Sequence, residues 1–212
     1  KINKKVSLYK NGVLINTWNC NVGRNSESGD KKVEGDRRTP SGSFYVCTRN
    51  DKSVAYLSLG LSYPSSDDAD KGFASGLITE EQRDAIKKAI SSGVMPPWNT
   101  PLGGAIMIHG NYRENGATRG CVAVANDVMD VLWQYCMLGA KVDIGPFRAF
   151  GNQAFWKFHR YFFIIRHIKH SIFVLNKALC LHCPHNPVFI IICLLNFWIN
   201  ALKQSIISLS VK

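Results

Sequence analysis

The segment 106–122 constrains the fold of this chain more than any other. An apolar run, 105–108, ends at His109 and a glycine, and a glycine-containing loop, 111–120, leads to Cys121 and a second apolar run. Short apolar runs bounded by glycine are typical of buried strands. The segment therefore predicts a short strand that ends at His109 and a loop that can bring His109 and Cys121 together.

His109 and Cys121 are the residue types that catalysis by a thiol nucleophile requires. A cysteine attacks as the thiolate, so it needs a neighbouring base or dipole that lowers its pKa. Gly120 lets the backbone turn so that consecutive N–H groups converge on a developing oxyanion. A buried cysteine near an unrelated histidine is the alternative interpretation. His109 is the only histidine before residue 159, and both residues adjoin glycine, which favours the catalytic one.

Two motifs, in a fixed order, give the chain a family resemblance. One is Gly-Asp-x-x-Thr-Pro-x-Gly-x-Phe at 35–44; the other is His-Gly at 109–110 followed by Thr-x-Gly-Cys at 118–121. Together they resemble the L,D-transpeptidase catalytic domain (YkuD/ErfK family), over residues of about 4–145. The insert at 63–104 is similar to that of one branch of the family. We expect it to be either a lid over one side of the catalytic cleft or a surface helix.

The resemblance implies a set of functional residues. Cys121 would be the nucleophile, His109 the general base and then acid, and the Gly110 carbonyl the group that orients the histidine. Backbone N–H groups of Arg119, Gly120 and Cys121 would form the oxyanion hole. The residues expected to line the substrate groove are Asn111, Tyr112, Arg113, Thr118 and Arg38.

The chain also departs from the family pattern. Arg119 stands where the family often has His or Ser, and Ala123 where many members have Arg or Asn. The spacing from His109 to Cys121 is short for the cross-linking members. These differences leave the nucleophile intact but leave the acyl acceptor open. Arg38 has a second interpretation as well, as a solvated residue of its turn.

The activity that the resemblance implies is that of a peptidoglycan L,D-transpeptidase. Tetrapeptide stems would acylate it, and it would form 3→3 cross-links or exchange the terminal D-amino acid. The alternatives are an L,D-carboxypeptidase or hydrolase of wall-linked peptides and, outside the enzymes, an inactive cell-wall-binding module. We expect no metal and no organic cofactor. No signal peptide is recognisable in this sequence. The cell envelope is therefore expected from the family resemblance alone.

Local patterns predict an α+β domain built on a mixed β-sandwich with an inserted helix. Asn-Gly at 11–12 predicts a hairpin turn within the strand-like stretch 4–22. A capping box at 79–82 predicts the inserted helix, and Asn126–Asp127 predicts the N-cap of a second helix that ends at Gly139. The other expected strands are 44–47, 54–59, 105–108 and 141–144.

A sharp change of composition divides the chain near Pro146. All 15 acidic residues lie before it, whereas 147–212 carry Lys, Arg, aromatic residues and apolar runs with no acid. We therefore expect a catalytic domain at 1–146 and a basic, aromatic, helical tail at 147–212. Three interpretations of the tail stay open: a membrane-associated extension, a helical hairpin packed on the domain, and a shifted reading frame. None of its apolar runs reaches the uninterrupted length of a bilayer span.

Cysteine and histidine spacing indicates neither a metal site nor a disulfide framework. The 7 cysteines show no dense spacing, and the run 180–185 holds Cys and His too closely for one tetrahedral zinc site. Cys20 and Cys47 could pair, but burial of both thiols is the simpler expectation. The net charge of +11 comes with no recognisable nucleic-acid-binding module. The oligomeric state is left unpredicted.

Overall fold

The computed structural model describes residues 3–145 and 207–211, which belong to one unit. Their strands form a mixed sheet in the order β2-β1-β8-β7-β3-β4-β5-β6. Within it the β5–β6 and β7–β8 pairs are parallel. The strands are β1 (Lys5–Lys10), β2 (Val13–Asn19), β3 (Gly42–Ser53), β4 (Tyr56–Leu61), β5 (Met107–His109), β6 (Val122–Ala123), β7 (Lys141–Ile144) and β8 (Ile207–Val211).

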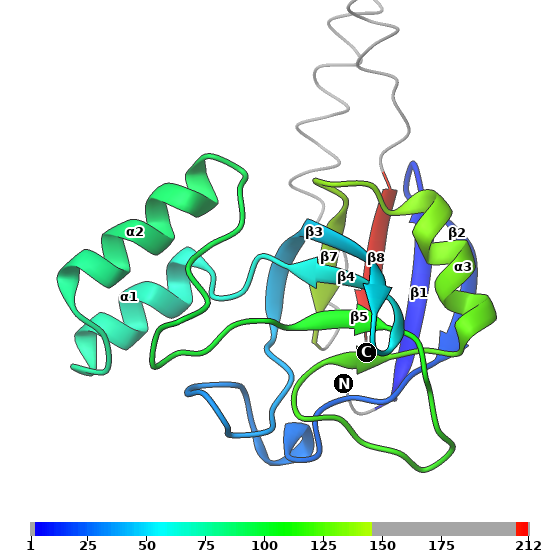
Figure 1. The fold of residues 1–212 in the computed structure, drawn as a ribbon, viewed down its shortest axis with the longest axis horizontal. Helices are drawn as coiled ribbons and strands as arrows, with labels where there is room; N and C mark the ends of the chain where they lie inside the picture. Colours follow the sequence, from blue (N-terminus) through cyan, green and yellow to red (C-terminus); the bar gives the residue numbers. More distant parts are fainter. Residues whose placement is uncertain (1–2, 146–206, 212) are drawn as a thin grey trace, which may run out of the picture. The chain divides into compact units, whose positions relative to one another are not determined.

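The sheet changes direction at β3, and its two halves pack around one core. β3 pairs with β7 on one side and with β4 on the other, and Figure 1 shows β4 and β5 running across the direction of β1 and β8. Leu8 and Leu209 from one half and Ile108 from the other belong to the same buried cluster, which α3 (Asn126–Tyr135) completes. The α+β class and the mixed sheet are confirmed. The two halves around the core are parts of one continuous sheet.

The first hairpin forms as the sequence predicts. Asn11 and Gly12 have φ angles of 54° and 79°, the left-handed conformation that these two residue types adopt most readily. Val6 and Leu8 of β1 are fully buried, whereas β2 is largely exposed and forms the edge of the sheet.

β8 lies between β1 and β7, although its residues come after the tail in sequence. Leu209 pairs with Leu8 of β1 and with Val142 of β7, and Leu209 and Val211 are fully buried. The sequence analysis placed all of 147–212 outside the domain, because it relied on the change of composition. The structure instead includes β8 in the sheet. Its strand signal, an apolar residue at every second position between serines, was set aside with the rest of the tail.

The remaining expectations for the tail lie outside the described residues. These are the membrane, hairpin and reading-frame interpretations and the cysteine–histidine run at 180–185. Within the described residues, none of the helices combines the length and the hydropathy that a bilayer span requires.

Two helices occupy the insert between β4 and β5, where one was predicted. α2 (Glu80–Ser91) begins at the expected capping box, in which Thr79 and Gln82 bond to each other's main-chain N–H. α1 (Ser66–Ala74) begins with a capping box of its own. α1 was not predicted, because acidic residues and a glycine weaken its apolar pattern. Figure 1 shows both helices on the opposite side of the domain from α3. Their shared core is made of Ala69, Ile78, Ile86 and Leu102.

Three predicted boundaries differ in the structure, and the first two matter for the site. Val54 and Ala55 form a turn, and β4 begins only at Tyr56, which has a φ of 75°. Asn126 is the first residue of α3 and makes no capping bond, because the N-cap is the residue before it. The helix ends well before Gly139, which belongs to the turn that leads into β7.

Candidate active site

His109 and Cys121 lie on neighbouring parallel segments. His109 ends β5 and pairs with Ala123 of β6, and the Val124 N–H donates to the His109 carbonyl at 2.8 Å. Cys121 directly precedes β6 and stands two residues before Ala123. The β5–β6 pairing thus brings the segments that carry His109 and Cys121 side by side, although the loop 111–120 separates them in sequence.

The His109 ring is oriented by the carbonyl of the next residue. Its Nδ1 lies 2.7 Å from the Gly110 carbonyl oxygen. A carbonyl oxygen can only accept, so Nδ1 carries the proton in this bond and Nε2 is left as the basic nitrogen. The contact that the resemblance implies for Gly110 is therefore present, and it selects the tautomer that a base needs.

Gly110 is enclosed on three sides. A Cβ at this position would lie 2.5 Å from Asn126 Oδ1, 2.8 Å from Tyr56 Cβ and 3.0 Å from the Ala55 carbonyl oxygen. Asn126 Oδ1 also accepts from the Asn111 N–H at 2.8 Å. The start of α3 and the β3–β4 turn thus fix the peptide that orients His109. Sequence patterns identify Asn126 as a helix cap and Tyr56 as a strand residue, so neither was expected at the site.

The Cys121 thiol is half-buried and donates to the Ala105 carbonyl at 3.7 Å. Burial raises the pKa of this thiol, and the Met107 N–H and the charge of Lys31 act in the opposite direction. Among the described residues, its hydrogen bond goes to Ala105 and not to His109. Catalytic contacts of this kind commonly tighten only when substrate binds.

Thr118 shapes the turn that carries the cysteine. Its hydroxyl donates to the Cys121 carbonyl at 2.6 Å and accepts from the Gly120 N–H at 3.1 Å. Gly120 has a φ of 140°, and a Cβ there would lie 3.0 Å from the Arg38 carbonyl oxygen, so the position favours glycine. Because its N–H is bonded to Thr118, Gly120 is not a free oxyanion donor in this structure. The N–H groups of Arg119 and Cys121 remain the candidate donors.

The upstream Thr-Pro motif is joined to this turn by hydrogen bonds. The Thr118 N–H donates to the Val22 carbonyl, and the Thr118 carbonyl accepts from the Arg24 N–H, both at 3.0 Å. Between them, the Gly23 N–H donates to Thr39 Oγ1 at 2.8 Å. The two motifs that are far apart in sequence therefore form one structural unit.

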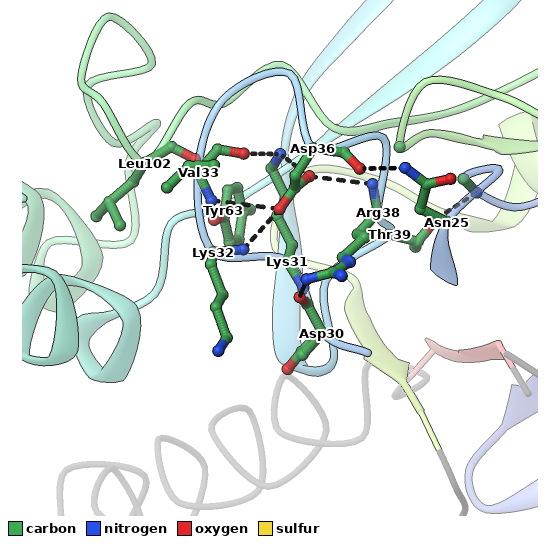
Figure 2. A network of polar contacts seen from close by, with 12 residues as sticks. Asn25, Asp30, Lys31, Lys32, Val33, Asp36, Arg38, Thr39, Tyr63 and Leu102 are labelled. Carbon is green, nitrogen blue, oxygen red and sulfur yellow. Dashed lines mark hydrogen bonds and ion pairs between the residues drawn. The ribbon is translucent and has the colours of Figure 1, made fainter. Parts of the chain in front are cut away.

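Asp36 is the centre of a polar network in the loop before Thr39 (Figure 2). Its carboxylate accepts from the N–H groups of Lys32 at 2.7 Å, Val33 at 3.2 Å and Arg38 at 3.0 Å. Burial raises the pKa of Asp36, but the N–H groups and the Lys31 ammonium outweigh it, so the pKa is lowered.

Lys31 is the cation of this network. Its Nζ donates to Asp36 Oδ1 at 3.1 Å and to the Val33 carbonyl at 3.0 Å. It also lies 5.7 Å from the centre of the Tyr63 ring. The side chains of Lys31 and Asp36 are 4% and 10% exposed, so this is a buried ion pair.

The residues predicted to line the groove differ in what their side chains do. The Arg38 guanidinium donates to the segment 28–30 at 3.3 and 3.4 Å, and so is engaged within its own turn. Asn111 and Arg113 have exposed side chains, and Tyr112 is half-buried. The main-chain N–H groups of these three residues are all bonded. The loop after His109 is therefore fixed while two of its side chains stay accessible.

The four described cysteines are all free. Burial raises the pKa of Cys20 and Cys136 to about 12 and that of Cys47 to about 11. Cys20 and Cys47 are both unpaired thiols; Cys20 is buried, as expected, whereas Cys47 is only half-buried. In residues 3–145 and 207–211, no group of three His, Cys, Asp or Glu residues is arranged to hold a metal ion.

Among solved structures, the chain is similar to three proteins. Bd1075 of Bdellovibrio bacteriovorus is 22% identical (TM-score 0.41), and the helical cell shape determining protein Pgp2 of Campylobacter jejuni is 22% identical (TM-score 0.42). Each match covers 66% of this chain and 42% of the other. An L,D-transpeptidase of Xylanimonas cellulosilytica is 17% identical (TM-score 0.33), over 62% of this chain and 50% of the other. The chain thus spans half or less of the length of these proteins.

A search of curated proteins found no match. A family model matches residues 1–144, which include both motifs, the His109–Gly110 contact and the Cys121 turn. The chain therefore belongs to the YkuD family, the L,D-transpeptidase catalytic domain.

Proposed function

We propose that the protein is a peptidoglycan L,D-transpeptidase that works through a thioester on Cys121. The observation that carries the proposal is the His109 ring, whose Nδ1 is held 2.7 Å from the Gly110 carbonyl, at the end of a strand that pairs with the strand directly after Cys121. This arrangement gives a thiol nucleophile a base with a free basic nitrogen. Family membership supports peptidoglycan peptides as the substrate and the cell envelope as the location.

The first step acylates the enzyme. Cys121 Sγ attacks the carbonyl carbon between the diamino acid and the terminal D-alanine of a tetrapeptide stem, and His109 Nε2 takes the thiol proton. The N–H groups of Arg119 and Cys121 stabilise the oxyanion, each by about 3 kcal/mol. When the intermediate collapses, the C–N bond breaks and His109 returns the proton to the leaving amine. D-alanine departs and a thioester remains on Cys121.

The second step transfers the acyl group. An amine of a second stem, or of a free D-amino acid, gives a proton to His109 and attacks the thioester carbonyl. The C–S bond breaks, and the Cys121 thiolate recovers the proton. The product is a 3→3 cross-link or an exchanged stem. Of the two departures from the family pattern, Ala123 is only 3% exposed while Arg119 is exposed. Arg119 is therefore the one that can contact an acceptor.

The test uses the full chain with tetrapeptide-containing muropeptides and mass spectrometry of the products. The wild-type protein should release D-alanine and form 3→3 dimers, and a carbapenem should add one covalent adduct at Cys121. Cys121→Ser should abolish these reactions. Cys47→Ser is the matched control, because Cys47 is also a partly buried free thiol, and it should retain them.

Two outcomes would change the assignment. Release of D-alanine without dimers would identify water as the acceptor, and the protein as the carboxypeptidase alternative. If Cys121 is neither acylated by the carbapenem nor required for turnover, the enzyme proposal fails and a wall-binding module is left.

A further inference from the structure

Lys31 is a buried cation that the mechanism above does not use. With 4% of its side chain exposed, its ammonium has given up water for two protein acceptors, Asp36 and the Val33 carbonyl. Burying a charge is costly unless it is paired and hydrogen-bonded. A solvated loop would need no such pair, which indicates that this one positions something.

We propose that Lys31 is a positioning residue for Cys121. Its ammonium, held in place by Asp36, provides positive charge near the thiol and orders the turn that packs against Gly120.

A path of contacts leads from Lys31 to the cysteine turn. Lys31 bonds to Asp36, and Asp36 Oδ1 also accepts from the Arg38 N–H at 3.0 Å. The carbonyl of the same Arg38 lies where a Cβ on Gly120 would approach it to 3.0 Å. One residue therefore meets the ion pair through its N–H and the glycine before Cys121 through its carbonyl. A shift of the ion pair would be passed on directly to the turn.

The Lys31 charge also acts on the Cys121 thiol through space. Burial raises the pKa of the Cys121 thiol above its ordinary value, and the Met107 N–H and the Lys31 charge offset part of that rise. Charges in a desolvated environment are screened weakly, so a fixed ammonium acts over a longer distance here than in water. Lys31 cannot swing away, because it is enclosed by its acceptors and the Tyr63 ring.

The other ionisable groups near the thiol do not duplicate this role. His109, on β5, is the base that takes the thiol proton. Arg119, in the cysteine's own turn, has an exposed side chain whose charge solvent screens. Asp36 is the counter-ion of Lys31, and three main-chain N–H groups share its negative charge. Lys31 is therefore the buried cation that favours the thiolate.

The inference deepens the proposed function, since it concerns the same thiol, but its test needs no stem peptide. We would measure the rate of Cys121 alkylation by iodoacetamide in the full chain from pH 6 to 10, cysteine by cysteine, using mass spectrometry. The variants are Lys31→Met, Lys31→Arg and the double variant Lys31→Met/Asp36→Asn, in which no charge is left buried alone. Lys32→Met is the matched control, because the Lys32 side chain is exposed and only its N–H contacts Asp36.

In the double variant, alkylation of Cys121 at pH 7 should slow about three- to tenfold, and its profile should move to higher pH. Lys31→Arg, which keeps the charge, should recover most of the rate, and Lys32→Met should behave as wild type. With a stem peptide as substrate, kcat should fall more than KM rises.

An unchanged alkylation profile in a folded double variant would overturn the proposal. Failure of both the single and the double variant to fold would also overturn it, because Lys31 would then act on stability alone. Normal alkylation together with no turnover of muropeptides by the wild-type protein would refute the proposed function while leaving this inference standing.

Discussion

His109 Nδ1 and the Gly110 carbonyl oxygen lie 2.7 Å apart, so the histidine is oriented by the peptide that follows it. No separate side chain is needed for this task. The orientation of the base therefore depends on a single peptide plane, and on the residues that hold that plane in place.

Gly110→Ala should reduce kcat/KM about 100-fold, because the new methyl would meet Asn126 and Tyr56 at 2.5 and 2.8 Å and displace the carbonyl. Steady-state kinetics measures the loss, and ¹⁵N NMR of His109 should show a mixture of tautomers. Gly93→Ala is the control: its Cβ would meet nothing within 4 Å, and although its φ of 68° strains the alanine locally, the change should spare kcat/KM. Equal losses in both variants would contradict the role of the Gly110 peptide.

Asn126→Ala should lower activity about tenfold with little change in stability. Its Oδ1 accepts from the Asn111 N–H at 2.8 Å and makes no capping bond. A helix cap lost to alanine would instead cost about 1 kcal/mol of unfolding free energy. Urea unfolding beside kinetics separates the two cases, and Asp127→Ala, on the same exposed turn, serves as the control.

Thr118→Val should disturb the cysteine turn, because it removes the hydroxyl that bonds the Cys121 carbonyl at 2.6 Å and the Gly120 N–H at 3.1 Å. We expect carbapenem acylation of Cys121 to slow at least tenfold, because leaving a buried polar group without its partner costs about 1 to 3 kcal/mol. Thr118→Ser keeps the hydroxyl and should acylate at near the wild-type rate. Slow acylation in Thr118→Ser as well would show that the hydroxyl bonds alone do not maintain the turn.

Asp36→Asn should cost about 3 kcal/mol of unfolding free energy at pH 7, because it leaves the Lys31 ammonium buried without a counter-charge. The pKa of Asp36 is lowered in the fold below its ordinary 3.8. Its contribution to stability is therefore complete above pH 3.8 and is lost as the pH falls through the folded value.

Urea unfolding at pH 7 and at pH 3 checks the sign of this effect. The gap between wild type and Asp36→Asn should narrow at the lower pH. Asp51→Asn, an exposed carboxylate on β3, should change stability by no more than about 0.5 kcal/mol. A gap that widens in acid would mean that burial outweighs the hydrogen bonds at Asp36.

Patterns that are local in sequence could be predicted. Asn11-Gly12 and the Thr79 capping box each act within four residues, so they identified the hairpin and α2. His109 and Cys121 were found because their residue types are rare and their flanking glycines place them in loops. The Asn126 and Tyr56 contacts could not be found in this way, since they depend on how distant segments pack around Gly110.

The Lys31–Asp36 pair and β8 were missed for different reasons. Charged residues five apart in a loop read as solvated, and only burial in three dimensions reveals an ion pair. β8 does alternate, with Ile207, Leu209 and Val211 between serines, but the composition of 147–212 placed it with the tail. Its pairing with β1 joins residues about 200 positions apart, which no window of sequence covers.

Leu209→Ala should reduce the unfolding free energy by about 3 kcal/mol, because Leu209 is fully buried between β1 and β7. Thermal or urea unfolding of the full chain measures it. Ile207→Ala, at the less buried start of β8, should cost clearly less. If Leu209→Ala and removal of 147–212 both leave stability and carbapenem acylation unchanged, β8 does not contribute to the stability of the folded sheet or to the activity of Cys121.

The position of β8 has a consequence for biosynthesis. Leu8 and Leu209 are partners in one ladder, so the sheet cannot be completed until residues 207–211 have been made. Contacts between such distant residues form slowly. Until then, β1 and β7 expose open edges on which other chains can pair. The β3–β6 half, which carries His109 and Cys121, can assemble earlier. The site-bearing half of the sheet and the edges that β8 covers are therefore completed at different times.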